Sequence, residues 1–214
     1  MMRADCIVFD LDGTLVDSLP DIATHLNAAL VEHGCQALTY ADIAERVGHG
    51  AEYLVRMSVP QLELADPVIA TFRARYQARP VIESRLYPGL AEILDRIARR
   101  KLAVLSNKPH AITVAVADVL LAKWPFQAII GKRDGHPFKP DPASLRELAR
   151  ELDVDVGACV LVGDTEVDVE TARAAGATSI GVTWGLRPRE VVTAAGPDHL
   201  VHSVAELAAV IDPL

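Results

Sequence analysis

Residues 6–15 read Cys-Ile-Val-Phe-Asp-Leu-Asp-Gly-Thr-Leu, and this stretch decides the fold. The apolar run over residues 6–9 predicts a strand that is buried on both faces, as is typical of a parallel sheet. Asp10 and Asp12 follow where the strand passes into a loop, and Gly13 permits a turn that a Cβ would hinder. Ligands bind at the carboxyl ends of the strands in such sheets. The two carboxylates therefore mark a candidate site for a divalent cation and for nucleophilic or acid–base chemistry.

Further strands and helices alternate along the second part of the chain. Short apolar runs predict strands over residues 102–105, 128–130, 159–162, 179–183 and 199–201. Helical patterns fall over residues 90–97, 111–121, 139–152 and 168–175, and Ser203 to Glu206 forms a capping-box pattern before a last helix. This alternation predicts an α/β fold: a Rossmann-like three-layer core around a parallel sheet with right-handed crossovers.

The segment over residues 16–83 interrupts this alternation once. It contains no strand-like apolar run, and its patterns predict helices over residues 20–31, 40–47, 51–57 and 67–77. We therefore expect a core domain of residues 1–15 and 84–214 and an all-helical cap domain of residues 16–83. The linkers at residues 16–18 and 83–85 would act as the hinge of a lid over the site.

The composition excludes several classes of protein. The formal net charge of −8 argues against a nucleic-acid binder, which usually presents a basic face. No apolar run approaches the roughly 20 residues that cross a bilayer, and the first residues lack a signal-peptide pattern. Three cysteines without C-x-x-C spacing are typical of reduced thiols. We expect a cytoplasmic protein without a membrane partner; the sequence indicates no oligomeric state.

Polar residues recur where the predicted strands end, and a parallel sheet would bring them to one edge. They are Asp10, Asp12, Ser106, Asn107, Lys139, Asp164 and Asp168. Several carboxylates beside one lysine repel one another unless a cation offsets their charge, and oxygen ligands suit Mg²⁺. The lysine and the Ser and Asn donors would then face the oxygens of a phosphoryl group.

These residues resemble the four signature motifs of the haloacid dehalogenase superfamily of phosphotransferases. The motifs lie in order at residues 9–14, 105–107, 139–140 and 163–168, and the helical insert matches the C1 cap of that superfamily. The stretches at residues 10–22, 48–50, 87–89 and 106–109 look most like phosphoglycolate phosphatases. The resemblance covers nearly the whole chain.

The resemblance implies a role for each site residue. Asp10 would be the nucleophile that forms an aspartyl-phosphate, and Asp12 would be the general acid and then the base. Mg²⁺ would be held by Asp10, the backbone carbonyl of Asp12 and Asp164, while Asp168 would act directly, through water or by orienting Lys139. The phosphoryl group would be bound by Ser106, Asn107, Lys139 and the Gly13 amide. His49, between two glycines of the cap, is a candidate contact to substrate.

The implied reaction is hydrolysis of a small phosphorylated metabolite, with 2-phosphoglycolate as the first candidate. Residues 16–83 contain no lysine, which argues against cleavage of a phosphonate through a Schiff base on the cap. Asp12 and the metal acids argue against dehalogenation, which would not need them. A sugar phosphomutase remains an alternative because it shares all four motifs. A metal-binding regulatory protein without catalysis is a further alternative, disfavoured by the presence of both Asp10 and Asp12.

Overall fold

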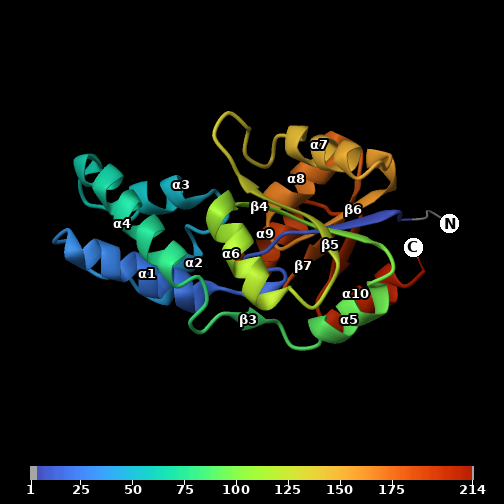
Figure 1. Ribbon diagram of the computed structural model, residues 1–214, viewed down its shortest axis with the longest axis horizontal. Coiled ribbons are helices and arrows are strands. Elements are labelled where there is room, and N and C mark those ends of the chain that lie inside the picture. The colour runs from blue at the N-terminus through green and yellow to red at the C-terminus, as the bar shows by residue number, and fades with distance from the viewer. Residues whose placement is uncertain (1–3, 214) are drawn as a thin grey trace.

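Six parallel strands form the central sheet of the computed structural model, which describes residues 4–213 (Figure 1). Their spatial order is β5-β4-β1-β6-β7-β8, so that the first strand of the chain lies between β4 and β6. The strands are β1 Cys6–Phe9, β4 Lys101–Pro109, β5 Phe126–Lys132, β6 Cys159–Gly163, β7 Thr178–Val182 and β8 His199–Val201. The predicted parallel sheet is confirmed.

Helices cover both faces of this sheet, which explains why β1 is apolar at every position. Cys6 and Val8 point to one face, where they join a cluster with Leu145 and Leu148 of α7. Ile7 and Phe9 belong to the larger cluster on the other face. The helices are α5 Leu90–Ile97, α6 His110–Leu120, α7 Ala143–Glu151, α8 Glu166–Ala175, α9 Arg189–Ala194 and α10 Val204–Ile211. The short 3₁₀ helix η2 Val156–Ala158 precedes β6. The three-layer α/β core is therefore confirmed.

One predicted helix begins several residues later than expected, and one predicted capping box forms only in part. The predicted helix over residues 139–152 begins at Ala143, because Lys139 is held in a loop by the side chain of Asn107. At the last helix, Ser203 caps the N–H of Glu206 as predicted, but the Glu206 carboxylate accepts from the N–H of His202, so the box is not reciprocal.

A helical lobe lies beside the core, at the left of Figure 1. It consists of α1 Leu19–Glu32, α2 Tyr40–Ala44, α3 Ala51–Arg56, the 3₁₀ helix η1 Leu62–Leu64 and α4 Ala65–Ala78. Its apolar side chains continue the larger cluster of the core. The expectation that no strand begins at residue 16 is wrong, because β2 Val16–Asp17 pairs with β3 Arg85–Leu86. Strands of two residues are too short to show a periodic pattern.

One buried carboxylate ties the two connections of this lobe together. Asp21, in the first turn of α1, accepts hydrogen bonds from the backbone N–H groups of Ile82, Glu83 and Ser84 at 2.9, 2.8 and 3.0 Å. The chain that enters the lobe is thus fixed to the chain that leaves it, next to the β2–β3 pair. The hinge predicted at these linkers stays a prediction.

Two further observations concern the chain as a whole. No helix within residues 4–213 is both long and apolar enough to span a membrane. All three cysteines are buried and unpaired, as the expectation of reduced thiols requires.

Candidate active site

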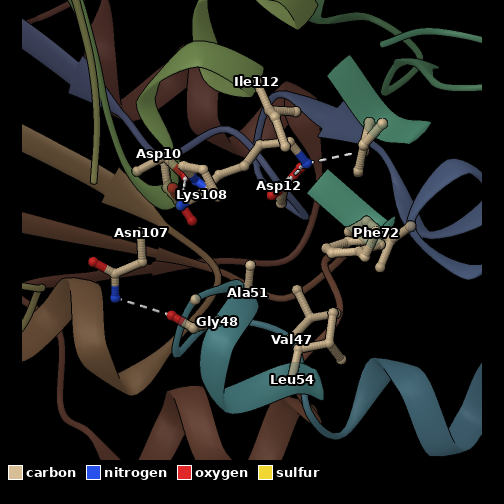
Figure 2. Close-up of a pocket in the computed structure, with 15 residues that line it drawn as sticks. Asp10, Asp12, Val47, Gly48, Ala51, Leu54, Phe72, Asn107, Lys108 and Ile112 are labelled. Carbon is tan, nitrogen blue, oxygen red and sulfur yellow. Dashed lines mark hydrogen bonds and ion pairs between the residues drawn. The ribbon is translucent and has the colours of Figure 1, made fainter. Parts of the chain in front are cut away.

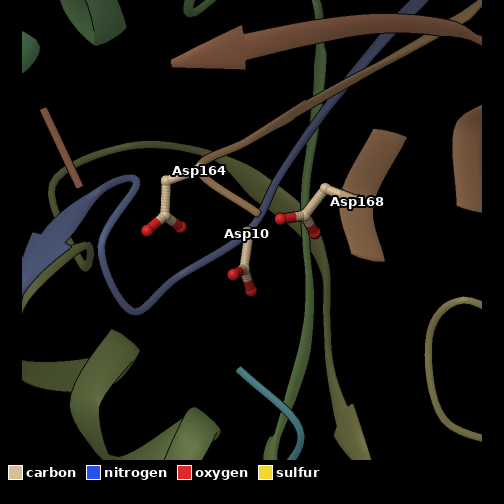
Figure 3. A group of neighbouring side chains, drawn as sticks. All are labelled: Asp10, Asp164 and Asp168. Atoms are coloured by element: carbon tan, nitrogen blue, oxygen red, sulfur yellow. The ribbon is translucent and has the colours of Figure 1, made fainter. Parts of the chain in front are cut away.

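Three carboxylates converge at the carboxyl edge of the sheet (Figure 3). Asp10 directly follows β1, Asp164 directly follows β6, and Asp168 lies in the first turn of α8. One oxygen from each lies within 4.8 Å of the others, and all three residues are buried. The structure therefore brings together three of the four predicted metal-binding residues by their side chains.

Asp164 is held in place by a turn that requires glycine. Its carboxylate accepts from the Thr14 hydroxyl at 3.1 Å and from the Leu186 N–H at 2.8 Å. Gly13 has a φ of +85°, and a Cβ at this position would lie 2.3 Å from the Asp164 carboxylate. The Gly13 amide donates to the Val16 carbonyl at 2.9 Å rather than pointing free toward a phosphoryl group. In this structure, Gly13 therefore makes room for Asp164.

Lys139 connects the nucleophile candidate to Asp168. Its Nζ lies 3.0 Å from Asp10 Oδ1, 2.6 Å from Asp168 Oδ1 and 2.8 Å from the Leu105 carbonyl. The other oxygen of Asp168 accepts from the N–H and the hydroxyl of Thr165, in a capping box that begins α8. Both oxygens of Asp168 thus have partners, which favours its role in orienting Lys139.

Burial shifts the pKa values of these groups. It raises the pKa of Asp10 to about 6, against the opposing effect of Lys139. Burial, together with the charges of Asp10 and Asp168, raises the pKa of Asp164 to about 8. Burial alone would lower the pKa of Lys139, but the charges of Asp10 and Asp168 raise it above its usual range. The single positive charge of Lys139 thus does not balance the negative charges of the three buried carboxylates.

The acid cluster fits a hard divalent cation. Asp10 Oδ1 is buried, and its ion pair with Lys139 Nζ at 3.0 Å lacks hydrogen-bond geometry. Carboxylate oxygens on a shared centre are the ligands that Mg²⁺ takes in proteins, and a cation would offset the repulsion that raises the pKa of Asp164. A divalent cation is thus the natural complement of these residues.

Ser106 and Asn107 lie within β4, at the end that faces Asp10. Both are buried, and both line the cavity described below. The Asn107 amide donates to the Gly48 carbonyl of the helical lobe and to the Lys139 carbonyl, each at 3.0 Å, and accepts from the Lys139 N–H at 2.9 Å. Asn107 therefore connects the core, the loop of Lys139 and the helical lobe. The sequence predicted only that Asn107 contacts the substrate, and it did not predict this connecting role.

Sequence reasoning assigned no role to Lys108, which holds the side chain of Asp12. Lys108 Nζ lies 3.0 and 3.1 Å from the two Asp12 carboxylate oxygens and 2.9 Å from the Tyr76 hydroxyl. Its side chain is only 4% exposed. The one available signal was its position directly after Ser106 and Asn107 at the end of a strand.

A cavity lies between these residues and the helical lobe, with about 500 Å³ of space not filled by atoms (Figure 2). The core contributes the polar wall, which includes Asp10, Asp12, Ser106, Asn107 and Lys108. The opposite wall is mostly apolar, with Ile22, Val47, Ala51, Leu54 and Phe72, and Tyr76 as its polar side chain. The site therefore opens into a space whose far wall is apolar.

His49 lies at the junction of the helical lobe and the core. Arg187 donates to its Nε2 at 2.8 Å, and Glu166 Oε1 lies 3.8 Å from the same atom. Its neighbours Gly48 and Gly50 line the cavity, whereas His49 is not among the lining residues. Contact between His49 and substrate stays a prediction that this placement does not favour.

The fold and the acid cluster define a class: α/β proteins with a helical insert and a cluster of aspartates at the carboxyl ends of the strands. The family model of haloacid dehalogenase-like hydrolases matches residues 7–182. The chain belongs to this family of hydrolases, as its motifs indicated.

Individual relatives agree with this assignment over almost their whole length. A plasmid-encoded phosphoglycolate phosphatase from Cupriavidus necator is 35% identical over 97% of this chain and 93% of its own. A phosphoglycolate phosphatase from Rhodospirillum rubrum is 35% identical over 89% of this chain and 83% of its own. The crystal structure of a predicted phosphoglycolate phosphatase from Haemophilus somnus superposes with a TM-score of 0.90 at 26% identity, covering 98% of this chain and 99% of that chain. The chain is therefore similar to enzymes that hydrolyse phosphoric monoesters.

Proposed function

We propose that this protein is a Mg²⁺-dependent phosphatase that hydrolyses 2-phosphoglycolate through an aspartyl-phosphate on Asp10. The observation that carries the proposal is the position of the Asp10 carboxylate. It lies 3.0 Å from Lys139, belongs to the acid cluster and lines the cavity between the core and the helical lobe. The names of the relatives at 35% identity support the choice of substrate.

The side chains divide the reaction into two steps. In the first, a carboxylate oxygen of Asp10 attacks phosphorus, the bond from phosphorus to the leaving oxygen breaks, and Asp12 gives that oxygen a proton. In the second, Asp12 takes a proton from water, and the water oxygen attacks phosphorus to release phosphate and restore Asp10. Lys139 and the Ser106 hydroxyl face the phosphoryl oxygens throughout, and Asp168 keeps Lys139 in position.

When bound, Mg²⁺ would neutralise charge on the phosphoryl oxygens. Asp10, Asp164 and the backbone carbonyl of Asp12 would hold it. The raised pKa values of Asp10 and Asp164 support this assignment, because they indicate carboxylates that need a neighbouring positive charge. Residues 16–83 would act as the cap domain that excludes water, and residues 1–15 with 84–214 as the core.

The apolar wall of the cavity supports a small leaving group. Val47, Leu54 and Phe72 offer no hydrogen bonds to the several hydroxyl groups of a sugar. A sugar phosphomutase would have to bind those groups in this space, and leaving them without partners is costly. The lining therefore favours the phosphatase over the mutase.

The test is a screen of phosphate release over a panel of phosphorylated metabolites, with Mg²⁺ and with EDTA. We expect the highest kcat/KM with 2-phosphoglycolate and loss of activity in EDTA that Mg²⁺ restores. Conversion of glucose 1-phosphate to glucose 6-phosphate, with slower release of phosphate, would instead support the mutase.

A further inference from the structure

We propose that Lys108 recognises the carboxylate of the substrate and that this contact releases Asp12 for catalysis. The proposal rests on the function proposed above and assigns its specificity to one side chain. The substrate class is a small phosphomonoester whose leaving group carries a carboxylate.

The first observation is the charge of the cavity. Among the residues between 4 and 213 that line it, Lys108 is the one lysine or arginine (Figure 2). Lys139 is not among the lining residues, and its ammonium group is paired with Asp10 and Asp168. An anionic group on the leaving side of the substrate therefore meets one cation, and that cation is Lys108.

The second observation is that Lys108 is paired with Asp12 in this structure. Both oxygens of Asp12 point at its Nζ, at 3.0 and 3.1 Å. In this arrangement the carboxylate is directed at a lysine rather than at a leaving oxygen. A general acid must reach the oxygen that it protonates. Asp12 therefore has to exchange partners before it can act, and a substrate carboxylate on Lys108 would allow that exchange.

The third observation is that the helical lobe completes this anion site. Tyr76 of α4 stands over Lys108, with its ring centroid 4.1 Å and its hydroxyl oxygen 2.9 Å from Nζ. Lys108 donates to this oxygen, so the hydrogen of the Tyr76 hydroxyl remains available to an acceptor. Burial raises the pKa of Tyr76 to about 12, which keeps that hydrogen in place at neutral pH. A carboxylate bound here would contact the core through Lys108 and the lobe through Tyr76.

The experiment compares 2-phosphoglycolate with ethyl phosphate, which keeps the phosphoryl group and lacks the carboxylate. We expect the wild-type enzyme to prefer 2-phosphoglycolate in kcat/KM, and Lys108→Met to reduce this preference by about 30-fold or more, because it leaves the bound carboxylate without its charged partner. Lys108→Arg, which keeps the charge, should retain part of the preference. Lys123→Met is the matched control, because Lys123 is an exposed lysine that is paired with Asp95 and does not line the cavity.

Each outcome bears on a different statement. If Lys108→Met slows both substrates equally, Lys108 only positions Asp12 and the proposed recognition is wrong. If it changes neither, both roles are wrong. If the wild-type enzyme hydrolyses both substrates equally well, the proposed recognition is wrong, whereas no release of phosphate from 2-phosphoglycolate would mean that the proposed function itself fails. If circular dichroism shows that Lys108→Met does not fold, Tyr76→Phe is measured in its place, because it removes only the hydroxyl group. This variant should raise KM for 2-phosphoglycolate several-fold more than KM for ethyl phosphate. Equal effects on the two KM values would contradict the anion site.

Discussion

Replacing Asp21 by alanine should destabilise the protein strongly, although Asp21 lies outside the acid cluster. The substitution leaves the N–H groups of Ile82, Glu83 and Ser84 without their acceptor. A hydrogen bond to a charged group contributes roughly 1.5–3 kcal/mol, and such contributions are not additive. Glu83 is exposed, so water can replace part of the lost hydrogen bonding there, and we estimate a loss of about 3 kcal/mol in the free energy of unfolding for the three hydrogen bonds together. For a domain of this size that lowers Tm by roughly 6–12 °C.

The assay is thermal unfolding followed by circular dichroism, with Asp66→Ala as the matched control. Asp66 forms an ion pair with Arg56, but its side chain is 83% exposed. Its loss should shift Tm by no more than about 2 °C. A Tm for Asp21→Ala that matches the control would refute the reasoning that this carboxylate fixes the two connections of the lobe.

The pH dependence of this effect follows from the pKa of Asp21. Burial raises that pKa, but the hydrogen bonds from the N–H groups of Ile82, Glu83 and Ser84 lower it by more, so that the pKa ends below its usual range. A group with a lowered pKa in the folded state stabilises the protein above its unfolded pKa of about 3.9, and this stabilisation is lost as the pH falls through the folded value. The difference in Tm between wild type and Asp21→Ala should therefore persist from pH 7 to about pH 5.

Three further predictions concern the acid cluster and its lysine. Asp10→Asn should abolish phosphate release while keeping the wild-type circular dichroism spectrum, because an amide cannot attack phosphorus; turnover at the wild-type rate would exclude Asp10 as the nucleophile. Lys139→Ala should reduce kcat/KM by about 10²–10³-fold, as loss of a charge-stabilising group does elsewhere, whereas Lys123→Ala should not. Without metal, the pKa values of Asp10 and Asp164 in the folded state are raised to about 6 and about 8. Between about pH 4 and pH 8 the folded state therefore binds more protons than the unfolded state, and the free energy of unfolding falls as the pH rises. Mg²⁺ should therefore raise Tm more at pH 8 than at pH 5.5, and an equal rise at both would count against a site made of these carboxylates.

The parts of the fold that could be predicted are those that produce a pattern of apolar and polar residues within a short stretch of sequence. The four residues of β1 are apolar because both faces of the sheet are covered, and a run of this kind is visible without its partners. The ends of parallel strands lie at one edge by topology, which is why Asp10, Ser106 and Asp164 could be placed together. Polar residues at strand ends were thus informative as a set.

The contacts that escaped prediction depend on residues far apart in the chain. Lys108 is bonded to Asp12 and Tyr76, and nothing in its own neighbourhood indicates either partner. The same holds for Asp21 and its three backbone donors. The contact between Thr165 and Asp168, by contrast, could have been predicted, because the Thr-x-x-Asp spacing is a capping-box pattern. This contact fixes one oxygen of the Asp168 carboxylate.

The central position of β1 has a consequence for how the chain acquires its structure. Cys6 pairs with Lys101 on one side and with Cys159 on the other, so β1 is synthesised well before either of its neighbours in the sheet. Contacts of such long sequence separation form late and slow folding. The helices of residues 19–78 have local contacts and can form during that interval. A nascent chain of this protein therefore carries an ordered helical segment while its first strand is still an unpaired, fully apolar edge, which is the kind of surface that chaperones protect.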